Sequence, residues 1–273
     1  MRILFITDLH GDIPKYEFVF DTHRLKNVDL VVFGGDMLPS SGDFIYKQYH
    51  FIEWLKDYLR KFLSPVLIMM GNDDLIAYSD RFLSLSDLPN VGVLGFNNIV
   101  SVGDLEFIGY SYIPDVPFFL KDWCLLDNGQ SPHWPMKNGC YSRLGHKYAS
   151  LYKITNIFDF FKEKYLSHSL SSVPNPVNWR KTVFVSHVPP IGFGLDISFG
   201  GVSCGSYAVR DFIEEKQPLL SLHGHVHESY KMTENFFAGI GDTVCFQPGQ
   251  RKRWTSYLII DTNNILSNLE YKV

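Results

Sequence analysis

The sequence predicts an α/β protein, because short apolar strands alternate with helices along its first third. Three apolar runs cover about residues 3–7, 30–33 and 66–70, and each ends in a polar loop. A helix is expected after Pro14, and an amphipathic one over about residues 44–62. Strands that alternate with helices form largely parallel sheets, whose ligand sites lie beyond the carboxyl ends of the strands. The polar loops are therefore expected to meet at one edge of the sheet.

Each of these three loops carries side chains that can bind a ligand. The first loop holds Asp8 and His10, the second holds Asp36, and the third holds Asn72 and Asp73. Asp and Asn are also common in turns and helix caps, so any one of them alone is weak support for a site.

Two later strands end in histidines. The run Thr182 to Val185 leads to His187, and residues 219–222 lead through His223 to the unit Gly224-His225-Val226-His227. Neutral imidazole is the commonest metal ligand in proteins, so this arrangement predicts a metal site. His223 precedes the unit and is expected to have a structural role.

The rest of the chain predicts a second sheet and an insertion. Shorter runs with turn residues between them, over about residues 98–110 and 230–271, indicate hairpins of a mixed or antiparallel sheet. Residues 111–178 are less regular, rich in aromatic residues at first and then expected to be helical from about Arg143 to Tyr165. We interpret residues 1–273 as a single domain in which residues 111–178 cover or flank the site.

Charge, cysteine content and the length of the apolar runs limit which binding partners and which cellular compartment are expected. With a formal net charge of -4, the chain lacks the broad basic field of proteins that bind extended nucleic acid. Four widely spaced cysteines, at positions 124, 140, 204 and 245, read as reduced thiols. No apolar run suits a signal peptide or a membrane span, so a cytoplasmic protein without a membrane partner is expected, and a homo-oligomer stays open.

Taken together, the strand-end motifs resemble those of the calcineurin-like metallophosphoesterase family. That pattern is Asp-x-His, Gly-Asp, Gly-Asn-His-Asp/Glu, a His at a strand end, and Gly-His-x-His, and the match covers most of the chain outside residues 111–178. The resemblance implies a four-layer α/β/β/α sandwich with two mixed sheets. It also implies two divalent metal ions, one held by Asp8, His10 and His227, one by Asn72, His187 and His225, and both bridged by Asp36.

The resemblance further implies hydrolysis of a phosphomonoester or phosphodiester by a metal-bridging hydroxide. Carboxylate, amide and imidazole ligands suit Mn, Fe or Zn. Two such ions, about 3.5–4 Å apart, can clamp the attacking and leaving oxygens of an in-line displacement. The expected substrate is a small phosphorylated metabolite or a nucleotide, with Asn72 also close to it.

The chain departs from the family pattern at Asp73, where the family usually has a His. Asp73 is a candidate general acid because of its position and because like-charge repulsion from the neighbouring Asp74 can raise its pKa, but it fits a purely local hydrogen bond as well. Gln247 takes the Asn position of the family's Asn-Pro-Gly turn. The basic run after that turn makes Arg251 and Arg253 candidate substrate-binding residues, although such runs are often only solvated surface.

Two other functions stay open. The first is a metal-binding scaffold or regulatory module of the same fold with weak catalysis, which retention of all seven expected ligands opposes and Asp73 in place of the motif His leaves open. The second is a mononuclear hydrolase acting on non-phosphate esters or amides, which would leave Asp36 without a bridging role.

Overall fold

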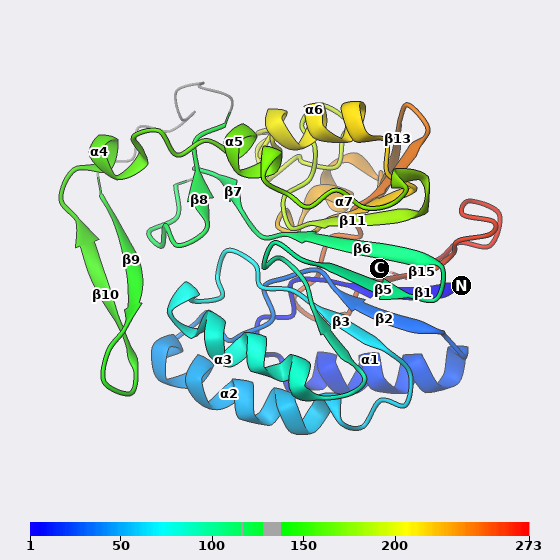
Figure 1. Cartoon of the computed structure of the whole chain (residues 1–273), viewed down its shortest axis with the longest axis horizontal. Coiled ribbons are helices and arrows are strands. Elements are labelled where there is room, and N and C mark those ends of the chain that lie inside the picture. Colours follow the sequence, from blue (N-terminus) through cyan, green and yellow to red (C-terminus); the bar gives the residue numbers. More distant parts are fainter. Residues whose placement is uncertain (116, 128–137, 273) are drawn as a thin grey trace.

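Two six-stranded sheets lie face to face between two layers of helices in the computed structural model, which describes residues 1–115, 117–127 and 138–272 (Figure 1). The predicted four-layer α/β/β/α sandwich is therefore confirmed. The first sheet has the order β16-β15-β1-β2-β3-β4, in which β1 to β4 run parallel and β15 and β16 run antiparallel to their neighbours. Its strands are β1 (Arg2–Ile6), β2 (Leu30–Phe33), β3 (Val66–Ile68), β4 (Val91–Val93), β15 (Tyr257–Asp261) and β16 (Glu270–Lys272).

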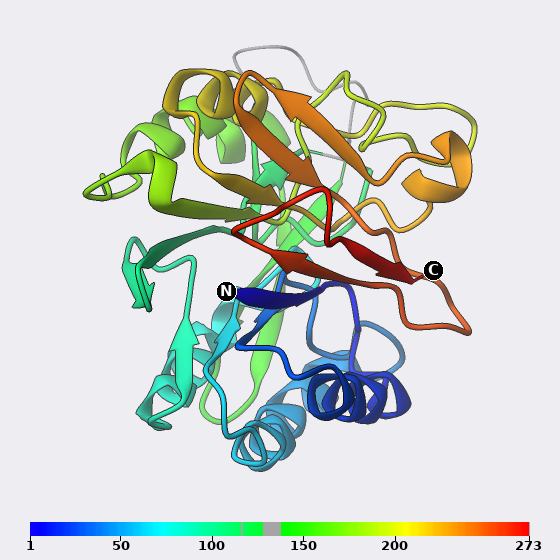
Figure 2. The ribbon, with the colours of Figure 1, turned by 90° about the vertical axis from the view of Figure 1, so that its right-hand side faces the viewer.

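The second sheet has the order β13-β14-β12-β11-β6-β5, with a parallel centre and an antiparallel strand at each edge. Its strands are β5 (Ile99–Val102), β6 (Leu105–Tyr110), β11 (Thr182–Ser186), β12 (Leu220–Leu222), β13 (Phe237–Ile240) and β14 (Thr243–Phe246). In Figure 2 the two sheets are seen from their side, with helices above and below them.

Helices cover the two outer faces (Figure 1). On the first sheet these are α1 (Ile13–Lys26), α2 (Phe44–Leu59) and the short α3 (Ser79–Leu83), and on the second they include α5 (Leu166–Ser171) and α6 (Tyr207–Lys216). A one-turn helix α7 (Ser229–Thr233) follows the histidine-rich loop, and single 3-10 turns occupy Ile76–Tyr78, Ser84–Asp87 and Trp179–Lys181. Among the described residues, no helix combines the length and the apolar character that crossing a bilayer requires.

The sandwich arises because the central strands are apolar on both faces. In β1, Ile3 and Phe5 join the core between the sheets, while Leu4 and Ile6 join the core under α1 and α2. In β11, Val183 and Val185 pack in that same inter-sheet core, whereas Phe184 packs toward α6. Successive side chains of a strand point to opposite faces, so each continuous apolar run fixes one strand between two layers.

The structure corrects two sequence predictions. The segment from Arg143 to Tyr165 is wrong as a helix: it begins in β9 (Gly139–Leu144), continues through β10 (Ala149–Ile154) and is helical only at α4 (Ile157–Phe161). The antiparallel pairing of β9 with β10 and the turn closed by the Gly145 N–H on the carbonyl of Tyr148 are hairpin features. The C-terminal pair β15 and β16 also joins the first sheet beside β1, whereas only β13 and β14 join the second.

The insertion contains two small sheets. One is the hairpin β9–β10, and the other is the parallel pair β7 (Ile113–Pro114) and β8 (Cys124–Leu125). Figure 1 shows this hairpin at one end of the molecule. Phe118, Phe119 and Leu151 of the insertion line the large cavity described below. His133, a histidine of the insertion to which the sequence assigns no partner, falls outside the described residues.

Candidate metal centre

Five loops meet beyond the carboxyl ends of β1, β2, β3, β11 and β12. Backbone hydrogen bonds join the first two loops: the N–H of Asp8 donates to the carbonyl of Gly35 (3.0 Å), and the N–H of His10 donates to that of Asp36 (2.8 Å). The loop after β12 is attached by its backbone as well, since the His225 N–H donates to the Asp8 carboxylate at 3.1 Å. The loops therefore hold each other before any ion is considered.

The backbone of this centre lies in an uncommon region. Asp8, His10, Asp36 and His225 have φ angles of 58°, 46°, 51° and 70°, which is the left-handed region. Asp and His tolerate this region better than most side chains, but each such residue still costs free energy. Residues held in this way tend to cluster at functional sites.

Asp8, His10 and His227 form a first group of ligand atoms. The Nε2 atoms of His10 and His227 lie 3.1 Å apart, and Nε2 of His227 lies 3.4 Å from Oδ1 of Asp8. Together with Asp36, each of these residues offers one atom within 4.8 Å of all the others. Such a spacing suits several ligands of one ion.

Asn72, His187 and His225 form a second group. Oδ1 of Asn72 lies 3.1 Å from Nε2 of His187 and 2.7 Å from Nδ1 of His225. The Nδ1–H of His187 donates to the carbonyl of Gly34 at 2.9 Å, so the ring is held with its Nε2 toward the centre.

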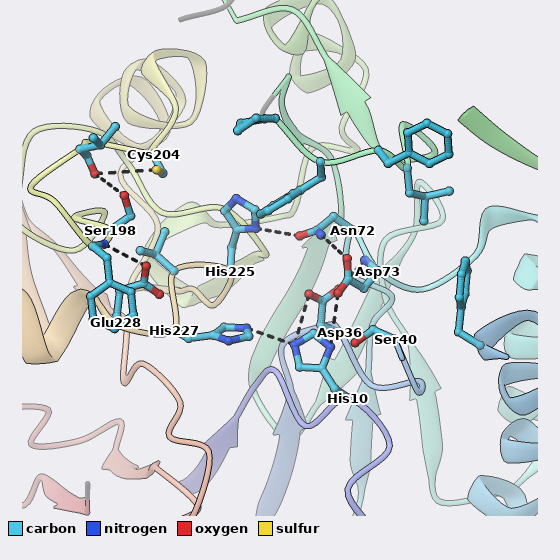
Figure 3. A pocket seen from close by; sticks show the side chains of 18 of the residues that line it. His10, Asp36, Ser40, Asn72, Asp73, Ser198, Cys204, His225, His227 and Glu228 are labelled. Atoms are coloured by element: carbon cyan, nitrogen blue, oxygen red, sulfur yellow. Dashed lines mark hydrogen bonds and ion pairs between the residues drawn. The ribbon is translucent and has the colours of Figure 1, made fainter. Parts of the chain in front are cut away.

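Asp36 lies between the two groups (Figure 3). Its Oδ2 is 3.8 Å from Nε2 of His10 in the first group and 3.4 Å from Nε2 of His187 in the second. Its Oδ1 accepts the backbone N–H of Asp73 at 2.8 Å, which fixes the carboxylate. One carboxylate oxygen thus faces both sets of candidate ligands.

The charges of the centre call for cations. Asp8 and Asp36 are 1% and 2% exposed, and two buried carboxylates need opposite charge nearby. Although burial opposes it, the carboxylates of Asp36 and Asp8 raise the pKa of His187 to about 10, so a proton supplies part of that charge. Burial, aided by His187, lowers the pKa of His225 to about 3 and keeps that imidazole neutral, as metal binding requires.

Two glycines let the loops approach so closely. A Cβ atom on Gly71 would overlap the backbone nitrogen and Oδ1 of Asp36, and one on Gly224 would lie 2.7 Å from Oδ2 of Asp8. A larger residue would therefore force Asp36 to move at position 71, and Thr7 or Asp8 to move at position 224.

Asp73 lies at the mouth of the centre, with a third of its side chain exposed. Its Oδ1 accepts a hydrogen bond from Nδ2 of Asn72 at 2.9 Å, and its Oδ2 lies 3.5 Å from Nδ1 of His10. Burial and the Asp36 carboxylate raise the pKa of Asp73 to about 7.

Asp74 has a structural task that the motif reading did not foresee. Its carboxylate accepts the backbone N–H groups of Met37 (3.1 Å), Leu38 (2.7 Å) and Gly71 (2.8 Å). Burial and Asp36 raise the pKa of Asp74 to about 8 against the effect of these donors. Asp74 thereby ties the loop that carries Asp36 to the loop that carries Asn72.

His223 lies behind the centre, in agreement with its expected structural role. Its buried Nδ1 is 3.0 Å from the carbonyl oxygens of both Ser186 and Val188, the neighbours of His187. It thus holds the His187 loop against the His225 loop.

A cavity of about 850 Å³ opens over the centre, and Figure 3 shows labelled side chains of its lining. Phe118, Phe119 and Phe199 give it large aromatic walls, and His10, Asp36, Asn72, Asp73, His225 and His227 give it a polar floor. Nothing in the sequence pattern had singled out Phe199 or Glu228, because a long loop and a turn bring them to the wall.

Of the two arginines predicted to bind substrate, one lines a cavity beside the centre and the other does not. Arg251 lines a second cavity that also contains His227, whereas Arg253 is exposed and lines neither of these two cavities. Gln247 fits the turn before them, since its Oε1 accepts the N–H of Gly249, and its Nε2 joins the turn to the histidine-rich loop by donating to the carbonyls of Gly224 (3.1 Å) and Val226 (2.6 Å).

The family model of the calcineurin-like phosphoesterases matches residues 1–229. The chain belongs to this family. The matched segment includes every strand-end loop of the candidate centre and stops before Arg251. Family membership agrees with the resemblance drawn from the motifs.

Among curated relatives, the chain is similar to the UPF0046 protein K07C11.7 of Caenorhabditis elegans. The two are 27% identical over 229 residues, which are 81% of this chain and 66% of the relative, so the chain spans slightly under two thirds of that protein.

Solved structures show the same fold. A dimetal phosphatase from Danio rerio is 11% identical with a TM-score of 0.56, over 99% of this chain and 95% of the other. The protein TT1561 of Thermus thermophilus is 15% identical with a TM-score of 0.54, over 99% of this chain and 97% of the other. At these identities the likeness concerns the fold alone.

Proposed function

We propose that this phosphoesterase hydrolyses a small phosphorylated metabolite or nucleotide with the help of two divalent metal ions. The observation that carries the proposal is the place of Asp36, one oxygen of which faces both groups of candidate ligands. Family membership and the description of the Danio rerio protein as a dimetal phosphatase support it. We further propose that residues 1–273 act as one domain.

The residues suit the ions that they would hold. Asp8, His10 and His227 would bind one ion, Asn72, His187 and His225 the other, and Asp36 both. Oxygen and imidazole ligands without thiolate suit Mn, Fe or Zn. When bound, two such ions supply Lewis acidity and lower the pKa of water at the site.

Side chains of the cavity would protonate the leaving group and bind the organic part of the substrate. Water attacks phosphorus, the bond between phosphorus and the leaving oxygen breaks, and that oxygen needs a proton unless it leaves as a stable anion. Asp73 lines the cavity and could deliver this proton from its carboxyl group. The aromatic walls would receive the organic part of the substrate, since small-molecule pockets are mostly apolar with a few polar groups.

Removal of metal is the first test. Protein stripped with a chelator is expected to lose hydrolysis of 4-nitrophenyl phosphate and bis(4-nitrophenyl) phosphate, and to regain it when loaded with Mn²⁺, Fe²⁺ or Zn²⁺. The reason is that Asp8 and Asp36 lose the cations that also activate water. Release of nitrophenolate and metal content per chain are measured together, and the preferred ester decides between monoesterase and diesterase.

Other outcomes of this test would contradict the proposal. Two bound ions without turnover of either ester would indicate the scaffold or regulatory function, in which the fold binds metal without efficient catalysis. One ion per chain with turnover of carboxylic esters or amides would indicate a mononuclear hydrolase.

Asp73 is tested through the leaving group. In Asp73→Asn, kcat for an alkyl phosphate ester is expected to fall about 100-fold, the scale of general acid catalysis. For the 4-nitrophenyl ester, kcat should change by less than about threefold, because nitrophenolate leaves without a proton. Equal decreases in kcat for the two esters would leave Asp73 with only a local hydrogen-bonding role. Asp73→His should retain hydrolysis of the alkyl ester, because its imidazole can also donate a proton.

A further inference from the structure

A second cavity of about 480 Å³ adjoins the candidate metal centre. It shares Phe199, His227 and Glu228 with the larger cavity, so the two spaces meet at a candidate metal ligand. Its own wall comes from α7 and from the loop between β14 and β15, both outside or at the end of the family match. We call this second cavity the basic pocket.

Three exposed cationic side chains line the basic pocket: Lys231, Arg251 and Lys252. The one carboxylate in its lining belongs to Glu228, whose Oε1 is already engaged by the N–H of Phe199 at 3.0 Å. Positive groups therefore outnumber negative ones, which contrasts with the acidic metal centre beside them. A guanidinium group next to ammonium groups is well suited to a phosphate.

The loop that presents these cations is anchored. The N–H of Gln250 donates to the carbonyl of His227 at 2.9 Å, and its Nε2 donates to the carbonyl of Thr7 at 2.9 Å. Nζ of Lys15 donates to the carbonyl of Arg251 at 2.7 Å. The basic loop is thus fixed directly to the residues around the metal centre.

A buried hydroxyl in the same lining is left unsatisfied. Ser256 is 1% exposed, and its Oγ has no hydrogen-bond partner among the described residues. This oxygen has almost no accessible surface, so it lies behind the cavity wall, and the cationic side chains are the groups that can reach a ligand.

We propose that the basic pocket binds a second phosphate group of the substrate while the first lies at the metal centre. This inference rests on the proposed function and narrows its substrate class to phosphoesters that carry a further phosphate. Arg251 and Lys252 would bind that phosphate, and Lys231, which lies 5.4 Å from the Phe199 ring, would complete the cationic wall.

The test compares two ligands that differ by one phosphate. Calorimetry on Mn²⁺-loaded protein uses the phosphonate analogues of thymidine 3′,5′-bisphosphate and thymidine 5′-monophosphate, which ester hydrolysis cannot consume, and is expected to give the bisphosphate analogue a Kd about tenfold lower. In the double variant Arg251→Met/Lys252→Met the two Kd values should become equal within about twofold. The control Arg24→Met/Lys61→Met removes equal charge from exposed positions outside both cavities and should keep the tenfold difference.

Hydrolysis of 4-nitrophenyl phosphate and of bis(4-nitrophenyl) phosphate is measured on the same preparations. If both activities are absent but the charge-dependent difference in Kd is present, the proposed function fails and the second phosphate site stands. Equal Kd values in the unaltered protein, or a difference that survives Arg251→Met/Lys252→Met, would overturn the inference whether or not either ester is hydrolysed.

Discussion

Replacing Asp36 by Asn is expected to lower hydrolysis of either nitrophenyl ester at least about a thousandfold, or about 4 kcal/mol of activation free energy. The amide has the shape of the carboxylate but no charge, and it offers one oxygen where two are used. One oxygen of Asp36 faces His10 and His187, and the other accepts the N–H of Asp73. Metal content should fall by at least one ion per chain, because the two groups of ligands lose their shared anion.

The matched control is Asp43→Asn, the same substitution at the exposed residue that precedes α2. It should leave both turnover and metal content within about twofold of the unaltered protein, since exposed changes away from the site have small effects. Asp36→Asn protein that retains two ions and a tenth of the activity would show that Asp36 does not bridge.

Replacing Asp74 by Ala is expected to lower the free energy of unfolding of the metal-free protein by about 4 kcal/mol. The substitution leaves the buried N–H groups of Met37, Leu38 and Gly71 without their acceptor. Each unsatisfied buried donor costs about 1–3 kcal/mol. Urea denaturation in the presence of a chelator measures the loss without a contribution from bound ions.

Asp80→Ala is the control for this experiment, because Asp80 is an exposed carboxylate in the first turn of α3. Its effect should stay within about 0.5 kcal/mol. Metal affinity should weaken in Asp74→Ala and not in Asp80→Ala, since Asp74 connects the loops of Asp36 and Asn72. An unchanged denaturation midpoint in Asp74→Ala would show that the three donors find water or other acceptors.

Much of the fold could be predicted because its central strands carry their signal locally. The strand ending before Asp8 and the strand ending before His187 are continuous apolar runs, and both are buried between two layers. Parallel strands bring their carboxyl ends to one edge, so residues far apart in sequence could be expected together there. The structure does bring these candidate ligands together, and their roles stay predictions until they are tested.

The remaining features depend on contacts that no local pattern encodes. In the sequence alone, the aromatic residues of β9 and β10 fit a helix as well as a hairpin. In the structure, the rings of Tyr141 and Tyr152 stack across the two strands, with their centroids 5.8 Å apart. The sheet that β15 joins is decided by its pairing with β1, at the other end of the chain. The wall around Phe199 comes from a loop whose path depends on tertiary contacts such as that with Glu228.

The left-handed backbone at Asp8, His10, Asp36 and His225 has a consequence for the history and engineering of this chain. Glycine adopts that conformation without steric cost, so on backbone grounds it would suit each of these positions better than the residue present. A library selected only for thermal resistance, without metal or substrate, should therefore accumulate Gly or Asn there. Such a selection would replace the candidate metal ligands early. The positions that change first would be those where function has been retained at a cost in the stability of the fold.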